Sequence, residues 1–313
     1  MQFIKSDTHI KFMARRKLAM ILSLSVILIS IISISFQGLN LGIDFTGGTL
    51  VEVGFEHPVD LPQVRAELAN DGFGDATVQH FGTSKDVLVR LASQEEVGSA
   101  ELSNRAFASL SKVTEGGKAE LRRVEFVGPQ VGDELTENGG LAMLYALIGI
   151  LIYVALRFEY RFAVGSVIAL IHDVVITIGL FSLFQIEFDL PVLAAVLAVI
   201  GYSLNDTIVV YDRIRENFRK MRKGKPSEIV DVSLNQTLSR TIMTSTTTMF
   251  VLIALFVFGG QIMHGFALAL IFGIVIGTYS SIYVASSAVL MLGISKADLM
   301  PVQKEGVELD SEP

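Results

Sequence analysis

Four ionisable side chains lie within long apolar stretches of this sequence. His172 and Asp173 are close to the midpoint of one stretch. Asp206 is about one turn from the end of the next, and Arg240 is near the start of a third. A charge at the centre of a membrane-spanning helix costs roughly 2.5 to 3.5 kcal/mol, so such residues pair with one another or take part in ion and proton pathways. The pattern therefore predicts a proton relay or a structural pair.

The depths of two of these residues suggest a specific pairing. Asp206 and Arg240 lie at similar depths in neighbouring stretches, which makes them candidate partners. Thr244 and Thr247 follow Arg240 at i+4 and i+7, and they therefore line the same helical face with hydroxyl groups. Simpler interpretations stay open. Arg240 could snorkel to the interface, Asp206 could pair with Arg213, and the threonines could satisfy backbone carbonyls.

The two intramembrane aspartates, Asp173 and Asp206, also resemble a protease dyad that shares one proton. The G-x-G-D context of membrane aspartyl proteases is absent around both, and neither H-E-x-x-H nor G-x-S-x-G occurs in the chain. Tyr202, one turn before Asp206, could donate a hydrogen bond to it or take part only in helix packing. We therefore expect no enzyme, no cofactor and, since cysteine is absent, no thiolate metal site.

The composition places these residues in a membrane protein. Hydrophobic residues make up 51% of the 313 residues, and the mean hydropathy is +0.54. Six apolar stretches are long enough to cross a bilayer as helices. They cover residues 18–36, 138–156, 162–184, 190–211, 238–258 and 266–292.

The distribution of basic residues predicts the orientation of these spans. Arg15, Arg16 and Lys17 place the N-terminal residues 1–17 in the cytoplasm, and six spans return the tail, residues 293–313, to the same side. The basic loop 212–237 is then cytoplasmic, and the acidic segment 37–137 is external. This charge pattern indicates contact with membrane lipid and argues against binding of nucleic acid.

The external segment has the pattern of a folded domain. Alternating apolar patterns and turn signals predict strands and helices in the order βαββαβ. This order is typical of the ferredoxin-like α+β fold, which serves many unrelated functions. The predicted fold class is thus an α-helical membrane protein with six transmembrane helices and one external ferredoxin-like domain. His57 and His80 are isolated and are expected to be surface or packing residues.

Three motifs carry a family resemblance. They are GIDFTGGT at 42–49, ALIHDVVITIGLF at 169–181 and IGYSLNDTIVVYDRIREN at 200–217. Together they resemble the SecF-type members of the SecD/SecF family, which is related to the resistance-nodulation-division transporters. The resemblance extends from the first span to the last. It implies a non-enzymatic subunit of the bacterial inner membrane that works with SecD beside the SecYEG channel and uses the proton gradient to draw out a secreted polypeptide.

The resemblance also implies roles for single residues. In the family, Asp206 of the L-N-D-T motif and Arg240 are associated with proton coupling. The candidate proton-coupling residues are Asp206, Arg240, Asp173, His172, Thr244 and Thr247. The candidate hinge or motif residues are Gly42, Asp44, Gly47 and Gly48. A hinge, a tight turn of the chain or simple packing would each explain the paired glycines Gly47 and Gly48.

Two other functions remain possible on sequence grounds. One is half of a proton-driven exporter of lipids or small molecules from the same superfamily, although such exporters usually carry larger external domains. The other is a purely structural assembly subunit, which would not need a buried charge. The sequence does not determine whether the coupling ion is H⁺ or Na⁺, or whether the external domain touches the exported chain.

Overall fold

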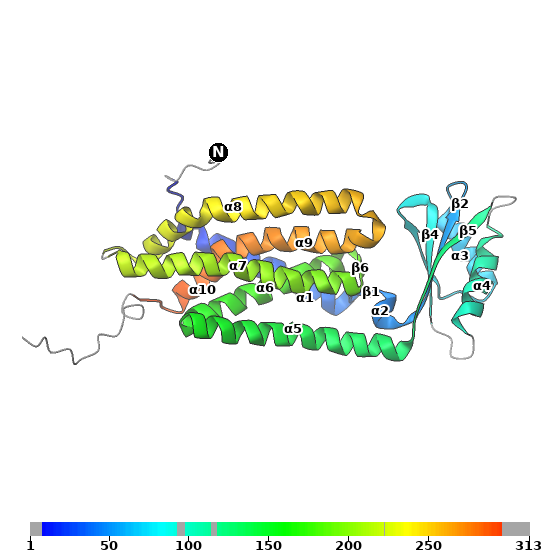
Figure 1. Ribbon diagram of the computed structural model, residues 1–313, viewed down its shortest axis with the longest axis horizontal. Coiled ribbons are helices and arrows are strands. Elements are labelled where there is room, and N and C mark those ends of the chain that lie inside the picture. Colours follow the sequence, from blue (N-terminus) through cyan, green and yellow to red (C-terminus); the bar gives the residue numbers. More distant parts are fainter. Residues whose placement is uncertain (1–7, 93–97, 114–117, 222, 296–313) are drawn as a thin grey trace, which may run out of the picture.

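The computed structural model describes residues 8–92, 98–113, 118–221 and 223–295. A long helical bundle fills one part of the molecule, and a small α/β domain lies at one end of it (Figure 1). Within the described residues, six helices are long and apolar enough to cross a membrane. The predicted fold class is confirmed. Residues 1–7 and 296–313 of the predicted terminal segments lie outside the described residues.

Except for the last, the bundle helices are longer than the apolar stretches that predicted them. They are α1 Arg16–Gln37, α5 Pro129–Arg157, α6 Tyr160–Phe184, α7 Leu190–Lys220, α8 Pro226–Phe258 and α9 Gly260–Ser280. A short 3₁₀ turn, Met13–Arg15, precedes α1. Polar turns extend α5, α7 and α8 because a helix continues until a breaker stops it. Pro129 and Pro226 therefore mark two of these starts.

The last membrane helix is interrupted near its end. After α9, one π-helical turn, η2 Ser281–Ala285, leads into α10 Ser286–Met291. The Ser286 hydroxyl donates to the Ser281 carbonyl oxygen at 3.1 Å, five residues earlier. Single π-helical turns within α-helices occur frequently at functional sites.

The α/β domain, here called the sheet domain, covers residues 48–127. Its elements are β2 Gly48–Phe55, α3 Leu61–Asn70, β3 Thr77–Phe81, β4 Thr83–Leu91, α4 Ser99–Leu110 and β5 Ala119–Val127. The strand order is β3-β4-β2-β5 with antiparallel neighbours, as in a ferredoxin-like sheet. Helices α3 and α4 cover one face, and fully buried residues such as Val51, Val89, Leu68 and Leu102 form the core.

Two short elements connect the sheet domain to the bundle. Strand β1, Asn40–Leu41, pairs in parallel with β6, Glu187–Phe188, which lies between α6 and α7. The short helix α2, Ile43–Thr46, then leads into β2. The chain that leaves α1 is therefore held against the start of α7 before it enters the sheet domain.

Burial is uneven around the bundle. About half of the apolar window of α6 and of α7 is buried, 56% and 50%, but only 11% of the window of α5 and of α8. Small residues allow the inner helices to approach closely: Gly179 of α6 faces Ser30 of α1, and Gly277 of α9 faces Ser203 of α7. Helices α5 and α8 thus present most of their surface outward.

Candidate functional site

The carboxylate of Asp206 is held by hydroxyl groups from two other elements. Its side chain is buried on α7. Oδ1 accepts a hydrogen bond from Thr241 Oγ1 of α8 at 2.9 Å, and Oδ2 accepts one from Ser281 Oγ at the start of the π-helical turn at 3.1 Å. A hydroxyl can either donate or accept, so both partners can stay in place when the carboxyl group gains a proton. The site therefore suits a group that changes its protonation.

Arg240 lies near Asp206 but is not ion-paired with it. Its side chain is exposed on α8, and the salt bridges among the described residues do not join the two. Its charge still acts electrostatically on the Asp206 carboxylate. The alternative partner, Arg213, instead pairs with Glu216 at 2.8 Å. The Tyr202 hydroxyl is buried without a hydrogen-bond partner in the described part of the chain, so it does not bond Asp206.

The two predicted threonines lie on the outer face of α8. Thr244 donates to the carbonyl oxygens of Arg240 and Thr241, and Thr247 donates to those of Met243 and Thr244. Both side chains are exposed. The residue that reaches Asp206 is Thr241, which the sequence analysis missed. One position along a helix rotates the side chain by about 100°, so Thr241 points inward where Arg240 points outward.

Asp173 is the centre of a second buried polar cluster. It is fully buried on α6, and its Oδ1 lies 2.8 Å from Nδ1 of His172. Its Oδ2 accepts hydrogen bonds from Ser203 Oγ of α7 at 2.5 Å and Ser280 Oγ of α9 at 2.7 Å. The sequence analysis named Asp173 and His172 but neither serine. Serines in apolar helices are common and carry no signal until the packing is known.

The two aspartates belong to one connected site. Ser280 and Ser281 are consecutive residues, and they bond Asp173 and Asp206 respectively. Ser203 and Asp206 are also nearly one turn apart on α7. A shift of α7 or of the π-helical turn would therefore alter the surroundings of both carboxylates together.

The predicted motif residue Asp44 caps the helix that carries Asp206. Its Oδ2 accepts a hydrogen bond from the backbone N–H of Leu190, the first residue of α7, at 2.8 Å. Asp189 caps the same end by accepting from Val192 N–H at 2.9 Å. Gly42 allows this close approach, since a Cβ there would lie 3.2 Å from Cβ of Asp189. Negative groups at a helix N-terminus are stabilising. The motif thus connects the sheet domain with α7.

The paired glycines of the motif are tightly constrained. Gly47 and Gly48 have φ angles of 66° and 124°, which favour glycine. A Cβ on Gly47 would lie 2.9 Å from Cα of Pro129, and one on Gly48 would lie 2.5 Å from the carbonyl oxygen of Leu91. This geometry fits the tight turn and the close packing considered in the sequence analysis. A hinge role stays a prediction.

Charged groups tie the sheet domain to the bundle near β6. Arg90 of β4 forms a salt bridge with Glu187 at 2.6 Å and also donates to the Leu41 carbonyl oxygen at 2.9 Å. Gln79 of β3 donates to Glu187 at 3.2 Å. A cleft of about 570 Å³ lies beside these contacts, and Asp44 and Asp189 also line it. Burial, followed by the nearby charges of Glu187 and Asp44, raises the pKa of Asp189 to about 6.

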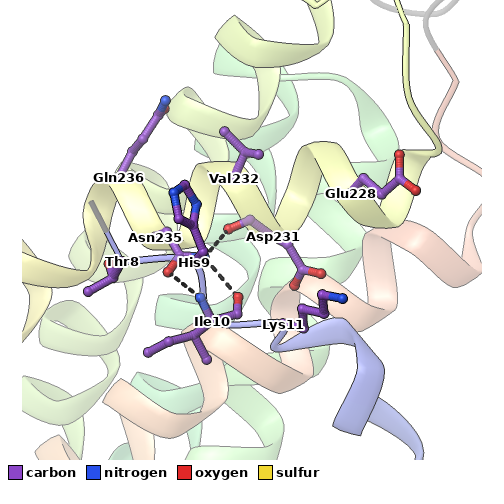
Figure 2. Close-up of a pocket in the computed structure, with 9 residues that line it drawn as sticks. All are labelled: Thr8, His9, Ile10, Lys11, Glu228, Asp231, Val232, Asn235 and Gln236. Atoms are coloured by element: carbon purple, nitrogen blue, oxygen red, sulfur yellow. Dashed lines mark hydrogen bonds between the residues drawn. The ribbon is translucent and has the colours of Figure 1, made fainter. Parts of the chain in front are cut away.

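A second polar cleft, of about 530 Å³, lies at the opposite end of the bundle, between residues 8–11 and α8 (Figure 2). Here the Asn235 side chain makes two hydrogen bonds with the backbone of Ile10, at 2.9 and 2.8 Å. Asp231 accepts from the backbone N–H of Met13 at 2.8 Å. These contacts attach the segment before α1 to α8. The polar side chains of Asn235 and Asp231 are therefore engaged in this attachment.

Among the described residues, no group of three or more His, Asp or Glu side chains could hold a metal ion. His57 and His80 are not partners in any such group. The site is therefore made of carboxylates, one imidazole and hydroxyl groups. Groups of these types can bind and transfer protons, and hydrogen bonds join their surroundings across α1, α6, α7, α8 and α9.

Comparisons with known proteins agree with this description. A family model described as protein export membrane protein SecD/SecF, C-terminal, matches residues 107–295, and the SecD/SecF GG motif matches residues 32–59. The protein translocase subunit SecF of Vibrio alginolyticus is 57% identical over 100% of this chain and 99% of its own length. The subunit of the same name from Pseudomonas aeruginosa is 49% identical over 94% of this chain and 95% of its own length.

Two solved structures also match. The crystal structure of SecDF, a translocon-associated membrane protein from Thermus thermophilus, is 40% identical with a TM-score of 0.83 and covers 93% of this chain. A crystal structure of SecDF in a super-membrane-facing form is 41% identical with a TM-score of 0.67 and covers 91% of this chain. This chain spans only 39% of the length of each.

The fold and the site define a multi-pass membrane protein with a connected pair of buried carboxylates. The chain belongs to the SecD/SecF family of protein-export membrane proteins, with the function of a SecF-type subunit of protein translocase. The relatives are named as protein translocase subunits, which is a transport function. The similarity over the whole chain does not favour the alternative of an exporter half.

Proposed function

We propose that this subunit couples proton movement to protein export through Asp206. The observation that carries the proposal is the buried carboxylate on α7, which among the described residues is held by the hydroxyl groups of Thr241 and Ser281. A proton arriving at Asp206 neutralises it, and the hydroxyl that faces the protonated oxygen can then accept while the other continues to donate. Arg240, which forms no salt bridge with Asp206 among the described residues, would favour the ionised carboxylate if α8 brought it closer. Alternating approach of α8 would drive uptake and release.

The movement of α7 would reach the sheet domain through the contacts at its N-terminus. Asp44, from the segment that enters the domain, caps α7, and Glu187 at the same end holds Arg90 of β4. The two SecDF structures, nearly equal in identity to this chain, match it with different TM-scores. This supports a family architecture in which the matched segments change their arrangement. We propose that such a change pulls on the secreted polypeptide outside the membrane.

The partner surface is proposed to lie on the outer face of α8. Arg240, Thr244 and Thr247 are exposed there, at depths where lipid would disfavour the charge. A second membrane subunit covering this face would shelter Arg240, and SecD is the partner that the family name and the SecDF structures suggest. The SecYEG channel and the exported chain would contact the assembly, and lipid would cover the remaining apolar faces.

The orientation in the inner membrane follows from the basic residues. The end of α5, the start of α6 and the end of α7 lie at the bundle end away from the sheet domain (Figure 1). These helix ends carry Arg157, Arg161, Arg219 and Lys220. By the positive-inside rule this end faces the cytoplasm, together with both termini, and the sheet domain is external.

The central experiment replaces Asp206 with Asn, which keeps the size but removes titration. Export into membrane vesicles is measured with ATP alone and with an added proton gradient. Asp206→Asn should keep the ATP-driven part and lose the stimulation by the gradient. Asp212→Asn is the matched control, since Asp212 lies on the same helix but is exposed and bonded to Arg157. If Asp206→Asn kept full stimulation, the coupling acid would be another residue, with Asp173 the next candidate.

The partner surface can be tested separately because the chain contains no cysteine. Thr247→Cys, labelled with a thiol-reactive photocrosslinker, should crosslink to SecD on illumination in native membranes. A cysteine at Thr237, which is buried on the inner face of the same helix, is the control and should not. Crosslinking from Thr237 but not from Thr247 would place the partner elsewhere.

A further inference from the structure

A chain of hydrogen bonds runs from Asp173 to α1. His172 Nδ1 lies 2.8 Å from Asp173 Oδ1, and His172 Nε2 lies 3.2 Å from Ser23 Oγ. Ser23 Oγ lies 3.0 Å from the hydroxyl of Tyr279, which donates to the carbonyl oxygen of Ala19 at 2.8 Å. All of these groups are buried or partly buried, with His172 3% exposed. The chain therefore joins α6, α9 and α1.

The direction of each bond can be assigned from its far end. A carbonyl oxygen only accepts, so the single proton of the Tyr279 hydroxyl goes to Ala19. Ser23 must then donate to Tyr279, and it has no second proton for His172. His172 Nε2 consequently carries a proton and donates to Ser23. The bond between His172 Nδ1 and Asp173 Oδ1 needs a second proton in addition to the one on Nε2. This second proton can be carried by either Nδ1 or Oδ1.

All four bonds thus exist together only when the His172–Asp173 pair holds one proton more than a neutral imidazole beside a carboxylate. If that proton leaves and Nδ1 keeps the remaining one, Nε2 has no donor facing it. If Nε2 keeps it, the bare Nδ1 faces the carboxylate. One hydrogen bond of the chain is lost in either case.

We propose that the His172–Asp173 pair is a second proton-binding site of this protein, and that Ser23 and Tyr279 are positioning residues that connect its protonation to α1. The inference rests on the proposed function in taking protons as the coupling ion. Its geometry does not depend on Asp206 being the first site. Helix α1 leads directly to the sheet domain, so a proton-dependent contact between α1 and α6 lies on the route to that domain.

Other contacts show that the α1–α6 interface suits small adjustments. Ser33 of α1 bonds Ser182 of α6 at 2.8 Å, and Ser182 also donates to the Gly38 carbonyl oxygen at 2.7 Å. The buried residues of α1 itself are alanine and serine. Such an interface holds two helices closely through weak polar contacts rather than large interlocking side chains. The loss of one bond at Ser23 is therefore a substantial change for this contact.

The groups around the pair are few. Helix α9 contributes Tyr279 and the hydroxyl of Ser280, α7 contributes Ser203, and α1 contributes Ser23. Tyr283 of the π-helical turn packs on Tyr279, and Asp206 is reached only through Ser281 next to Ser280. Arg240 of α8 acts on Asp206. Among the described residues, the His172 imidazole is the basic group that contacts the Asp173 carboxylate, and the pair is a salt bridge only when the imidazole is protonated.

The test follows the imidazole directly by NMR in the full-length chain with isotope-labelled histidine. The chain has five histidines, and His172→Gln identifies the signal. Ser23→Ala removes the acceptor of the Nε2 proton, so His172 should lose its proton at a lower pH, by about one pH unit for one hydrogen bond. Tyr279→Phe should shift it in the same direction by less, and Ser23→Thr should restore the original titration.

Two matched controls lie nearby. Ser25 is exposed on α1 and donates to its own helix, and Tyr283 packs on Tyr279 without being part of the chain of bonds. Ser25→Ala and Tyr283→Phe should leave the titration unchanged. A shift to higher pH in Ser23→Ala would show that Ser23 donates to a neutral His172 and would overturn the proposal. An unchanged titration would overturn it as well.

The same variants separate this proposal from the proposed function. In export assays, the alkaline limit of gradient stimulation should move to lower pH in Ser23→Ala but not in Ser25→Ala. An unchanged limit would overturn the role of the pair in coupling. If Asp206→Asn kept full stimulation while the histidine titration behaved as expected, the role of Asp206 would fail and the second site would stand.

Discussion

The carboxylates at the two levels of the bundle have different partners. At the end that carries the sheet domain, Glu187 pairs with Arg90, and Asp44 and Asp189 accept from backbone N–H groups of α7. Inside the bundle, the partners of Asp206 among the described residues are two hydroxyls, and those of Asp173 are two hydroxyls and an imidazole.

This difference separates fixed contacts from adjustable ones. A guanidinium and a backbone N–H can only donate, so they hold a carboxylate in one position, even where burial raises its pKa as at Asp189. A hydroxyl or an imidazole can reverse its role when a proton arrives. The structure therefore places rigid attachments where the sheet domain meets α7 and reversible ones where protons would be bound.

The strongest test of the rigid end is Gly48→Val. A Cβ at this position would lie 2.5 Å from the Leu91 carbonyl oxygen, and the φ of 124° disfavours a β-branched residue. We expect the sheet domain to lose about 3 kcal/mol or more of stability. Its thermal unfolding in detergent measures this. Gly74→Val is the control, because a Cβ there meets no atom within 4 Å. Equal unfolding of the two variants would contradict the constraint.

Glu187→Gln should loosen the attachment of the sheet domain to the bundle. Arg90 and Glu187 are 13% and 25% exposed, so the loss of this largely buried pair should cost about 2 kcal/mol. Hydrogen exchange at residues 40–41 and 187–188 should become faster by at least tenfold. Asp71→Asn, which breaks the exposed pair with Lys112, should not change this exchange. Slow exchange in Glu187→Gln would mean that β1 and β6 hold the domain without the salt bridge.

Thr241→Val tests the adjustable site. The substitution keeps the shape of the side chain but removes the hydroxyl that donates to Asp206. Loss of one such bond should lower gradient-stimulated export by about tenfold, while ATP-driven export persists. Thr248→Val is the control, because the Thr248 hydroxyl donates to the Thr244 carbonyl oxygen of its own helix, so its loss should have little effect. The opposite ranking of the two variants would contradict the role of the Thr241 hydroxyl at Asp206.

The smallest expected effect concerns Asp189 and its pH dependence. Its pKa is raised to about 6, chiefly by burial, so the folded state binds this proton more tightly than the unfolded state. Stability from this group is therefore lost as the pH rises from about 4 through 6. Asp189→Asn keeps a capping side chain. It should raise the stability by about 1 kcal/mol at pH 7.5, after allowance for solvent screening, and by nothing near pH 4. Unfolding curves at both pH values check this. A destabilised variant at pH 7.5 would show that the charge itself is needed for the cap.

The sequence by itself determined the main elements. Six long apolar stretches predict six helices because backbone groups in lipid must bond within the helix. Alternating patterns between residues 47 and 127 predict the strands and helices of the sheet domain, whose order is confirmed. Asp206, Asp173, His172 and Arg240 were recognisable because ionisable residues in apolar helices are costly. The helix ends were less accurate, since polar turns extended α5, α7 and α8 beyond the hydrophobic signal.

Only the tertiary structure decided which side chains surround these residues. Thr241, Ser281, Ser203 and Ser280 look like many other hydroxyl residues in the chain, and their roles depend on helix rotation and packing. Ser23 is 149 residues from His172 and 256 from Tyr279. The capping of α7 by Asp44 likewise spans 146 residues. A sequence pattern predicts the face of its own helix on which a residue lies. Its partner on a neighbouring helix is determined only when the helices pack together.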